Sequence, residues 1–449
     1  MLSNFFRLEE HQTTASKEVL AGLTTFLTMA YILFVQPAVL SRDFAGNPTG
    51  LDAGAVLLAT CVSAAAATLI MGLYARYPIA LAPGMGQNFF FVTVVMSLTS
   101  TYGESAWKVA LGIVLVAGLL FLALSLLGVR EAILNALSPS LRNSIAVGIG
   151  MFIAFIGLQK ATLITGSPGT LVQLNPDLWT ADVAVFAAGF IATAALQARG
   201  FAVAVLVGIG ASALVAATMG KIELPTAWVG FPEISQSAVL VADVRQALSA
   251  VCLPYVFVFL FMDLFDTMGT LVGVAEQAGF VKDDQLPRAK QALTADAAGT
   301  VLGACLGTST VTSYIESAAG VQQGGRTGLV SVTVAGLFLL ALAFSPILAL
   351  VGEYPPVTAA ALLTVGATMC RNVTKIRWDD PSEAFPSFLV IVGIPLSFSI
   401  ADGLSLGVIS YVFIKLLSGK WREIGWVMCL LAVVLIIYFS TVRTQLIGN

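Results

Sequence analysis

Histidine is almost absent from this sequence, and little else in it could build a catalytic or metal centre. The one histidine, His11, precedes the first long apolar run, so histidine metal sites and proton relays are nearly excluded. The five cysteines lie in or beside apolar runs without the spacing of metal ligands, which is typical of free buried thiols. An enzyme would need a nucleophile–base pair or a metal cluster. We therefore expect no enzyme activity, no catalytic residues, no metal and no cofactor.

Charged residues are also scarce. They make up 10% of the 449 residues, against 58% hydrophobic residues, whereas soluble proteins carry about 25% charged residues. The sequence therefore predicts a polytopic helical membrane protein embedded in a lipid bilayer. The net charge of −3 gives no sign of a nucleic-acid partner. Residues 1–17 are polar and the first apolar run is too long for a signal peptide, so we expect no cleavable signal.

Apolar runs long enough to cross a bilayer, or nearly so, recur along the chain. Seven are expected in each half, near residues 19–40, 52–73, 79–98, 107–128, 142–159, 181–197 and 201–219, then 250–275, 287–305, 306–325, 328–351, 356–371, 383–400 and 402–418. A further apolar run at 424–441 is either an extra span or an interfacial helix.

Lysine and arginine are distributed unequally between the two sides of these spans. Only five of the 22 lie in the connections opposite the N-terminus, namely Arg42, Lys108, Lys160, Lys221 and Arg245. Because cytoplasmic loops carry the excess of positive charge, we expect a cytoplasmic N-terminus. An odd number of spans per half also gives the halves opposite orientations, which is the inverted-repeat plan of secondary transporters.

The third span of each half is interrupted. Pro83, Gly84 and Gly86 oppose a regular helix within residues 80–88, and glycines and hydroxyl side chains fill residues 307–320. Paired interruptions at corresponding positions mark a transport site. The last two spans of each half are expected to meet in tight turns at residues 198–200 and 401–403.

In the second interruption, the residues from Thr310 onwards favour a short strand. Glu316 would then begin a half-helix with its carboxylate at the positive end of the helix dipole. In the first interruption, Asn88 is expected to cap a half-helix. Two structural alternatives stay open: capping alone for Asn88, and a salt bridge that holds the bundle for Glu316.

Acidic residues inside apolar spans are costly, which makes them functional candidates. Asp263 and Asp266 are three residues apart, so they share one helix face. Asp296 in the next span is either a proton site or a structural partner of Asp263 or of a hydroxyl group. Burial disfavours the charged form of a carboxyl group, so these acids and Glu316 are candidates for proton coupling.

Carboxylates, an amide, hydroxyls and phenyl rings suit a flat, neutral heterocycle with several N–H groups. An anionic substrate is disfavoured because the expected spans lack an intramembrane Arg or Lys cluster. A same-fold carrier of a pyrimidine, of xanthine or of an anion stays an alternative. A channel would not need the paired interruptions.

Three motifs together resemble the AzgA-like purine permeases of the nucleobase–ascorbate transporter superfamily. They are Ala82-Pro83-Gly84-Met85-Gly86-x-Asn88, Phe265-Asp266-Thr267-Met268-Gly269-Thr270, and Gly307-Thr308-Ser309-x-x-Thr312-Ser313-Tyr314-Ile315-Glu316-Ser317. The opening stretch from Glu18 to Tyr31 also looks like theirs. The resemblance covers essentially the whole chain.

The resemblance implies an all-α fold of fourteen spans in two inverted repeats of seven, with spans 3 and 10 interrupted by strands. A UraA-like core domain would comprise residues 1–128 and 249–351, and a gate domain residues 129–248 and 352–449. It further implies a homodimer in the bacterial inner membrane. Such a protein would import adenine, guanine or hypoxanthine with protons by an elevator-type, alternating-access mechanism.

Asn88, Asp266 and Glu316 match the family's substrate-binding positions. The wider superfamily adds Phe89 beside the ligand, Thr270 one turn after the acid, and Tyr314 in the strand. Family members usually have a small residue after the motif asparagine, so Phe89 is a departure, and Gln87 is also less usual. A bulkier residue at this position would narrow the pocket or change the preference among purines.

Overall fold

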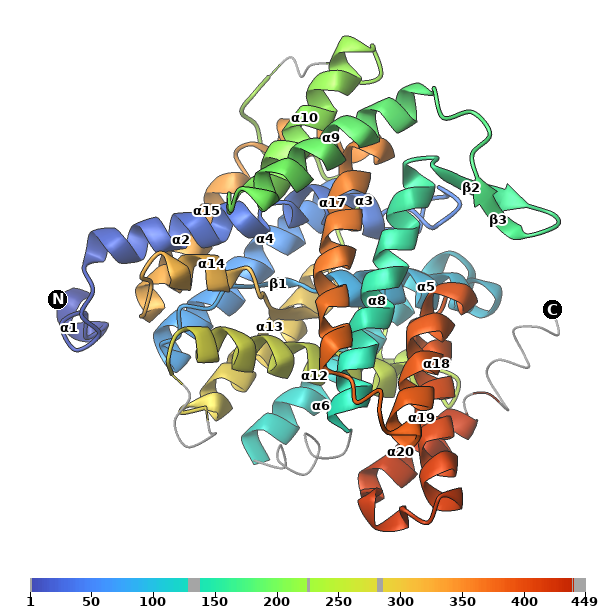
Figure 1. Cartoon of the computed structure of the whole chain (residues 1–449). Coiled ribbons are helices and arrows are strands. Elements are labelled where there is room, and N and C mark those ends of the chain that lie inside the picture. Colours follow the sequence, from blue (N-terminus) through green and yellow to red (C-terminus); the bar gives the residue numbers. More distant parts are fainter. Residues whose placement is uncertain (1, 128–137, 224–226, 281–285, 438, 440–449) are drawn as a thin grey trace.

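The computed structural model describes residues 2–127, 138–223, 227–280, 286–437 and 439, and these residues form a mostly helical protein (Figure 1). The first half contains α1 (Leu2–Phe5), α2 (Ala15–Met29), α3 (Ile32–Leu40), α4 (Ala53–Ile70) with the π-turn Met71–Ala75, β1 (Leu81–Pro83), α5 (Met85–Tyr102), α6 (Ala106–Leu127), α8 (Pro139–Lys160), β2 (Ile164–Ser167), β3 (Leu171–Leu174), α9 (Ala181–Ala198) and α10 (Ala204–Thr218).

The second half repeats much of this order. It contains α11 (Val244–Ala247), α12 (Leu253–Gln277), α13 (Ala289–Leu306), β4 (Val311–Ser313), α14 (Ser317–Gln322), α15 (Gly328–Ala341), α16 (Ser345–Glu353), α17 (Pro355–Met369), α18 (Pro381–Ser397), α19 (Ile400–Leu417) and α20 (Trp426–Ile437).

Each of the fourteen expected segments overlaps one of these helices. Seven described helices are long and apolar enough to cross a membrane, or eight if the bent pair α16–α17 is one span. The count of fourteen spans therefore stays a prediction. In the last apolar run, α20 has 12 residues, or about 18 Å against the roughly 30 Å of a hydrocarbon core. Residues 438, 440 and 441 of that run lie outside the described part.

The two interrupted segments meet at the centre of the molecule, where β1 pairs with β4 (Figure 1). The strands are antiparallel, and Ala82 lies opposite Thr312. One more backbone hydrogen bond extends the ladder at each end, from Gly84 N–H to the Thr310 carbonyl at 3.0 Å and from Tyr314 N–H to the Ala80 carbonyl at 2.9 Å. Each strand satisfies backbone groups of the other, which is why a non-helical backbone can lie buried here.

The prediction that Asn88 caps the first half-helix was wrong. Helix α5 begins at Met85 and its N-cap is Gly84, so Asn88 lies at the end of the first turn, where its N–H donates to the Gly84 carbonyl at 3.0 Å. Gly86 fits inside this turn. A Cβ at Gly86 would lie 2.7 Å from Cγ2 of Ile149, so this glycine permits close packing of α8 instead of breaking the helix.

One of the two expected turns was also placed wrongly. Gly200, with φ of +78°, ends the turn between α9 and α10 as expected. In the second half, however, residues 401–403 belong to α19, and the turn lies at Phe398 and Ser399. A Cβ at Gly403 would lie 2.4 Å from the Ile394 nitrogen. This glycine therefore serves close contact between α18 and α19.

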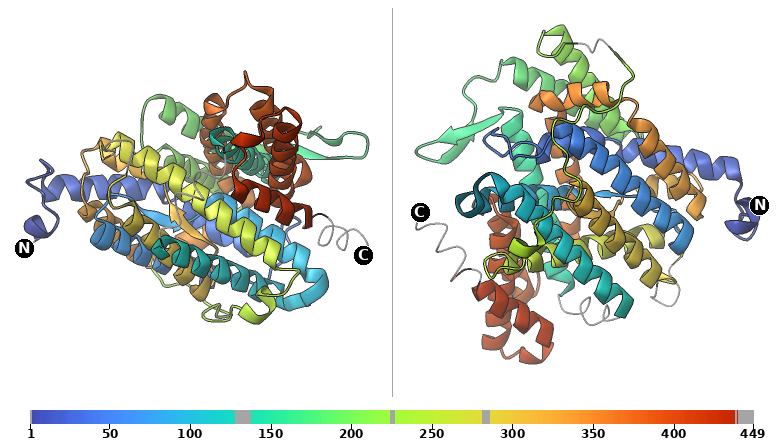
Figure 2. Two further views of the ribbon diagram at one scale, coloured as in Figure 1. Left: turned by 90° about the horizontal axis from the view of Figure 1, so that it is seen from below. Right: turned by 180° about the vertical axis from the view of Figure 1, so that it is seen from behind.

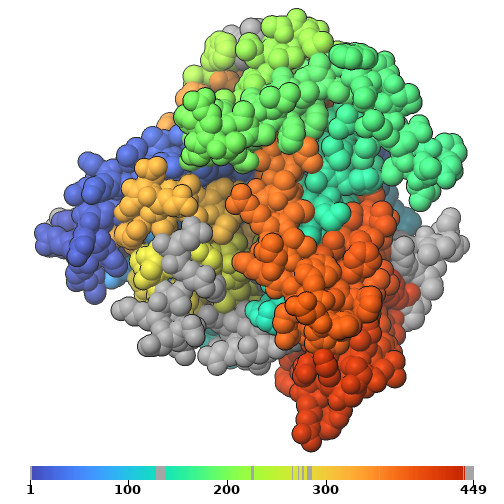
Figure 3. All heavy atoms as spheres, in the orientation of Figure 1, coloured from blue at the N-terminus to red at the C-terminus, as the bar shows by residue number. Residues whose placement is uncertain are grey.

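Two groups of helices pack mainly among themselves. In one, α8 lies along α17 and α18, and α9 contacts α10 and α17. In the other, α13 contacts α4 and α6, and α15 contacts α2 and α4. The two further views keep α18–α20 together at one side of the molecule (Figure 2), and α9, α17 and α18 form much of one face (Figure 3). The division into core and gate domains at the expected boundaries stays a prediction.

Candidate functional site

Glu316 and Asp266 both lie next to the antiparallel pair of strands β1 and β4, which is called the strand crossing below. Glu316 occupies the N-cap position of α14, and the Tyr31 hydroxyl of α2–α3 donates to its Oε1 at 2.7 Å. Asp266 on α12 accepts a hydrogen bond from Nε2 of Gln87 at 3.0 Å. Thr267, the residue after Asp266, shares a hydrogen bond with Thr312 of β4, and Tyr314 and Glu316 follow Thr312 on the same segment. The structure thus brings both carboxylates, an amide and two phenols together.

Neither carboxylate is neutralised by an ion pair among the described residues. A bundle-holding salt bridge at Glu316 is therefore not part of the described structure. Both side chains are half-buried. Half-buried acids held only by neutral donors keep free lone pairs that a ligand N–H can use.

Asn88 is fully buried and bridges three segments. Its Nδ2 donates to Oε1 of Gln36 on α3, and its Oδ1 accepts from the Ser309 hydroxyl just before β4. Gln36 in turn donates to the Thr308 hydroxyl at 2.8 Å. Asn88 therefore does more than cap α5, because it ties that helix to α3 and to the approach of the second strand.

Tyr314 and Thr312 fix β4 from both sides. The Tyr314 hydroxyl donates to the Pro83 carbonyl at 2.5 Å. The hydroxyls of Thr267 and Thr312 lie 2.8 Å apart and join α12 to β4. Because Asp266 directly precedes Thr267, the hydrogen bond between Thr267 and Thr312 also keeps Asp266 close to β4.

Asp263 and Asp296 lie deeper, on facing helices. The Thr300 hydroxyl of α13 donates to Asp263 at 2.9 Å, and the Ser313 hydroxyl donates to Asp296 at 3.3 Å. Both side chains are buried, and Oδ1 of Asp263 has no hydrogen-bond partner among the described residues. Asp296 thus has the hydroxyl partner that the sequence analysis left as one of its two alternatives.

Phe89 and Thr270 are separated from this polar cluster in the described contacts. The Phe89 ring stacks on Phe44 at a centroid distance of 6.4 Å and meets Phe152 of α8 edge-on at 6.1 Å. Phe89 therefore packs α5 against α8. Thr270 is buried on α12, one turn after Asp266. The side chain of Phe265 lies outside the described residues.

Sequence reasoning missed three residues of the site. Tyr31 and Gln36 lie in the first expected span, and Gln87 was noted only as unusual. A polar amide within an apolar run is the signal that would have found Gln36, because such a group needs a buried partner. No spacing rule connects it to Asn88, which is 52 residues away.

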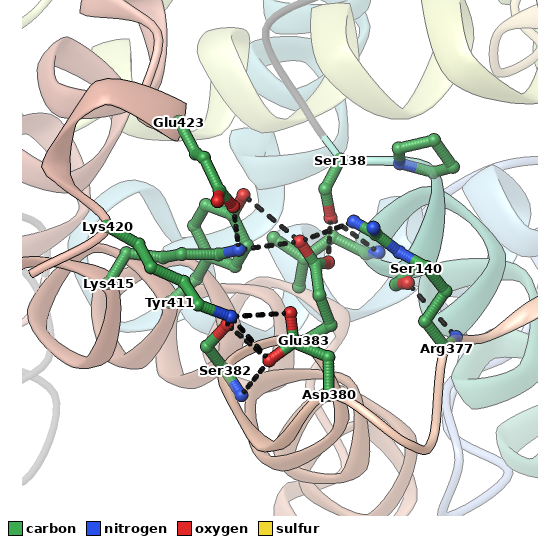
Figure 4. Close-up of polar contacts among 12 residues, drawn as sticks. Ser138, Ser140, Arg377, Asp380, Ser382, Glu383, Tyr411, Lys415, Lys420 and Glu423 are labelled. Carbon is green, nitrogen blue, oxygen red and sulfur yellow. Dashed lines mark hydrogen bonds and ion pairs between the residues drawn. The ribbon is translucent and has the colours of Figure 1, made fainter. Parts of the chain in front are cut away.

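A second polar cluster was also missed, and it joins the start of α8 to α18 and α19 (Figure 4). Glu383 and Lys415 are buried and lie 3.0 Å apart. Glu383 also accepts from the Ser138 hydroxyl at 2.7 Å and pairs with Arg377 at 2.9 Å. Beside them, Lys420 pairs with Asp380 at 2.8 Å. Every acid in this cluster has a basic partner. We therefore interpret the cluster as ion pairs that hold α8, α18 and α19 together.

No group of three or more His, Cys, Asp or Glu side chains suited to a metal ion occurs within the described ranges. The site consists instead of hydrogen-bonding groups at a strand crossing. It can bind a neutral polar ligand and hold protons on its acids.

The fold has close structural counterparts. The transmembrane domain of a cyanobacterium bicarbonate transporter, BicA, superposes with a TM-score of 0.62 over 88% of this chain and 97% of that domain, at 16% identity. SLC26A9 superposes with the same TM-score over 88% of this chain and 65% of its own. At such low identity the likeness establishes the fold alone, which is the UraA-like transporter fold.

Sequence relatives cover nearly the whole chain. The guanine/hypoxanthine permease PbuG of Bacillus subtilis is 42% identical over 447 residues, which are 98% of this chain and 99% of the relative. The adenine permease AdeP of Escherichia coli is 38% identical over 438 residues, 97% and 95% of the two chains. A family model described as Permease family, Xan_ur_permease, matches residues 16–406. The chain therefore belongs to this permease family and is a multi-pass membrane transporter, not an enzyme.

Proposed function

We propose that the protein imports purine nucleobases of the adenine, guanine and hypoxanthine class together with protons. The observation that carries this proposal is the pair of half-buried carboxylates, Asp266 and Glu316, beside the strand crossing. Ring N–H and exocyclic amino groups of a purine are donors, and carboxylates are acceptors. The permease relatives named for guanine, hypoxanthine and adenine support the same substrate class.

Within this proposal, Asp266 and Glu316 accept hydrogen bonds from the purine, and Tyr314 and Asn88 hold the two strands in place around it. Phe89 and Thr270, which the resemblance places near the ligand, act in this proposal only through the packing of α5 and α12. The proton is carried by one of the four acids, Asp263, Asp266, Asp296 or Glu316. A proton bound outside neutralises the acid, and its release inside restores the charge.

The transport cycle is proposed to be an elevator-type, alternating-access movement. The core group of helices, which carries the strand crossing, would slide against the gate group around α8 and α17. The proposal includes a homodimer in the bacterial inner membrane with the N-terminus in the cytoplasm. The excess of positive residues on the N-terminal side of the expected spans supports this orientation.

Ligand binding by purified variants tests the site. A ligand that binds only the folded protein raises its unfolding midpoint, so hypoxanthine, guanine or adenine is expected to stabilise the wild type. Glu316→Gln and Asp266→Asn should lose at least about tenfold in affinity, because each removes a charge-assisted hydrogen bond. Glu10→Gln is the matched control, since Glu10 is exposed and pairs only with Arg7 in the described structure. Unchanged purine binding by both site variants would refute the assignment.

A further inference from the structure

The side-chain amide of Gln87 uses its nitrogen in a hydrogen bond, whereas its oxygen has no hydrogen-bond partner among the described residues. Its side chain is 1% exposed. Nε2 donates to Asp266 at 3.0 Å, and Oε1 is a buried acceptor without a hydrogen-bond partner in the part of the chain that the structure describes. Buried polar groups are almost always paired. An unpaired carbonyl oxygen beside the proposed substrate carboxylate therefore indicates a missing donor.

The orientation of the amide follows from its neighbour. An ionised carboxylate only accepts hydrogen bonds, so with Asp266 ionised the amide nitrogen faces Asp266 and the amide oxygen points elsewhere. A Cβ at Gly84 would lie 2.2 Å from this oxygen and 2.7 Å from Cγ2 of Thr312. The oxygen thus lies over the strand crossing, in the space that the missing side chain of Gly84 leaves open.

Asp266 and Gln87 together present two neighbouring acceptors, a carboxylate oxygen and an amide oxygen. Guanine has two neighbouring donors on one edge, the ring N1–H and the 2-amino group. Hypoxanthine has the same ring and the same 6-oxo group but lacks the 2-amino group. A site with two fixed acceptors favours the ligand that pairs both, because the other ligand leaves a buried acceptor unpaired.

We propose that Gln87 is a specificity-determining residue whose Oε1 accepts a hydrogen bond from the 2-amino group of a 6-oxopurine, while its Nε2 holds Asp266 in position. This inference rests on the proposed function of the site. It narrows the substrate class to 6-oxopurines and predicts a preference for guanine over hypoxanthine of about tenfold, the usual value of one such hydrogen bond.

The test compares the affinities for guanine and hypoxanthine, measured by competition against labelled hypoxanthine uptake in proteoliposomes. The wild type should prefer guanine about tenfold. Gln87→Met keeps the length of the side chain but removes both hydrogen-bonding atoms. The affinities of this variant for guanine and hypoxanthine should therefore be about equal. Gln36→Met is the control: it disturbs the support of Asn88 and should weaken both ligands equally, leaving their ratio unchanged.

Three results would overturn the proposal. One is equal affinity of the wild type for the two purines, which needs no variant. Another is an unchanged ratio in Gln87→Met with both ligands weakened, because Gln87 would then act only through Asp266. The third is a Gln87→Met variant that keeps both the wild-type ratio of the two affinities and full affinity for both ligands. Failure of the wild type to take up either purine would instead refute the proposed function, so the two failures are distinguishable.

Discussion

Asn88 shows how one buried amide can join segments that are far apart in the sequence. Its two amide atoms are engaged by Gln36 and Ser309, and its side chain is fully buried. The residue that the family resemblance assigns to substrate binding therefore has protein partners on both sides. Its loss should affect the stability of the protein as well as its affinity for substrate.

We predict that Asn88→Ala lowers the unfolding midpoint of the ligand-free protein. The substitution leaves the buried Oε1 of Gln36 and the hydroxyl of Ser309 without this partner, at a cost of about 1–3 kcal/mol for each group. Thermal unfolding of the purified variant measures the effect. Glu316→Gln serves for comparison, because a half-buried acid with a single side-chain donor should change the ligand-free midpoint little. An Asn88→Ala midpoint equal to that of the wild type would contradict the bridging role.

At the residue level, the sequence predicted a set of polar site residues but not the partners that they contact. Asp266 and Glu316 were singled out because acidic groups at membrane depth are costly, and Tyr314 was singled out by the resemblance. Tyr31, Gln87 and Gln36, the partners of Glu316, Asp266 and Asn88, were not identified, because no rule of spacing connects residues separated by 50 to nearly 300 positions. The capping role of Asn88 was misjudged because Gly86, read as a helix breaker, permits the approach of Ile149.

Glycines control how closely the helices packed around α8 and α17 approach one another. Helices α8 and α17 cross at Gly150 and Gly366, where a Cβ at Gly366 would lie 2.3 Å from the Gly150 carbonyl oxygen. The obstructing atom belongs to the backbone, so it cannot move aside as a side chain would. Close packing of this kind through small residues is typical of helices in membranes.

Gly366→Ala should therefore destabilise the protein by about 1–3 kcal/mol, the usual cost of overpacking. Gly336→Ala is the matched control, since no atom lies within 4 Å of a Cβ at this position of α15. The control should be neutral or slightly stabilising, as alanine favours helix over glycine. Unfolding midpoints of both variants measure the difference. Equal midpoints would show that α8 and α17 do not pack as described.

The polar cluster between α8, α18 and α19 makes the stability of this part of the protein depend on pH. Hydrogen bonds from Lys420 and Ser382 lower the pKa of Asp380 below its usual value. A carboxyl group with a depressed pKa stabilises the fold above its unfolded pKa of about 3.9, and this stabilisation is lost as the pH falls towards the folded pKa.

Asp380→Asn should accordingly lower the unfolding midpoint at pH 7, and the difference from the wild type should shrink once the pH falls below about 4. Asp379→Asn removes the same charge from the neighbouring exposed position and should change the midpoint little. Thermal unfolding over this pH range measures the effect. A difference that stays constant from pH 7 to below pH 4 would contradict the role of Asp380.

At the element level, the order of helices followed from the apolar runs, and the two interruptions followed from their glycine, proline and hydroxyl content. The pairing of β1 with β4 brings together residues about 230 positions apart, and the pattern of a single chain holds no information on such pairing. The turn expected at residues 401–403 was wrong because Gly403 serves the contact with Ile394, and the chain reverses at Phe398.

The whole molecule combines a permease fold with a polar crossing at its centre. Composition alone identified a multi-pass membrane protein, and the three motifs identified the family to which the chain belongs. The movement of a core against a gate, the proton as coupling ion and the homodimer belong to the proposed function. These proposals concern free-energy differences between conformations, on which apolar runs and motifs carry no information.

One measurement tests the central claim most directly: uptake of labelled guanine and hypoxanthine by proteoliposomes under an imposed pH gradient, inside alkaline. A proton symporter should accumulate the purine above the outside concentration, and a protonophore should abolish this accumulation. Glu316→Gln should show neither accumulation nor saturable uptake, while Glu10→Gln should match the wild type. Uptake that ignores the pH gradient and the protonophore but requires sodium would contradict proton coupling. The absence of any purine uptake by the wild type would contradict the proposed function itself.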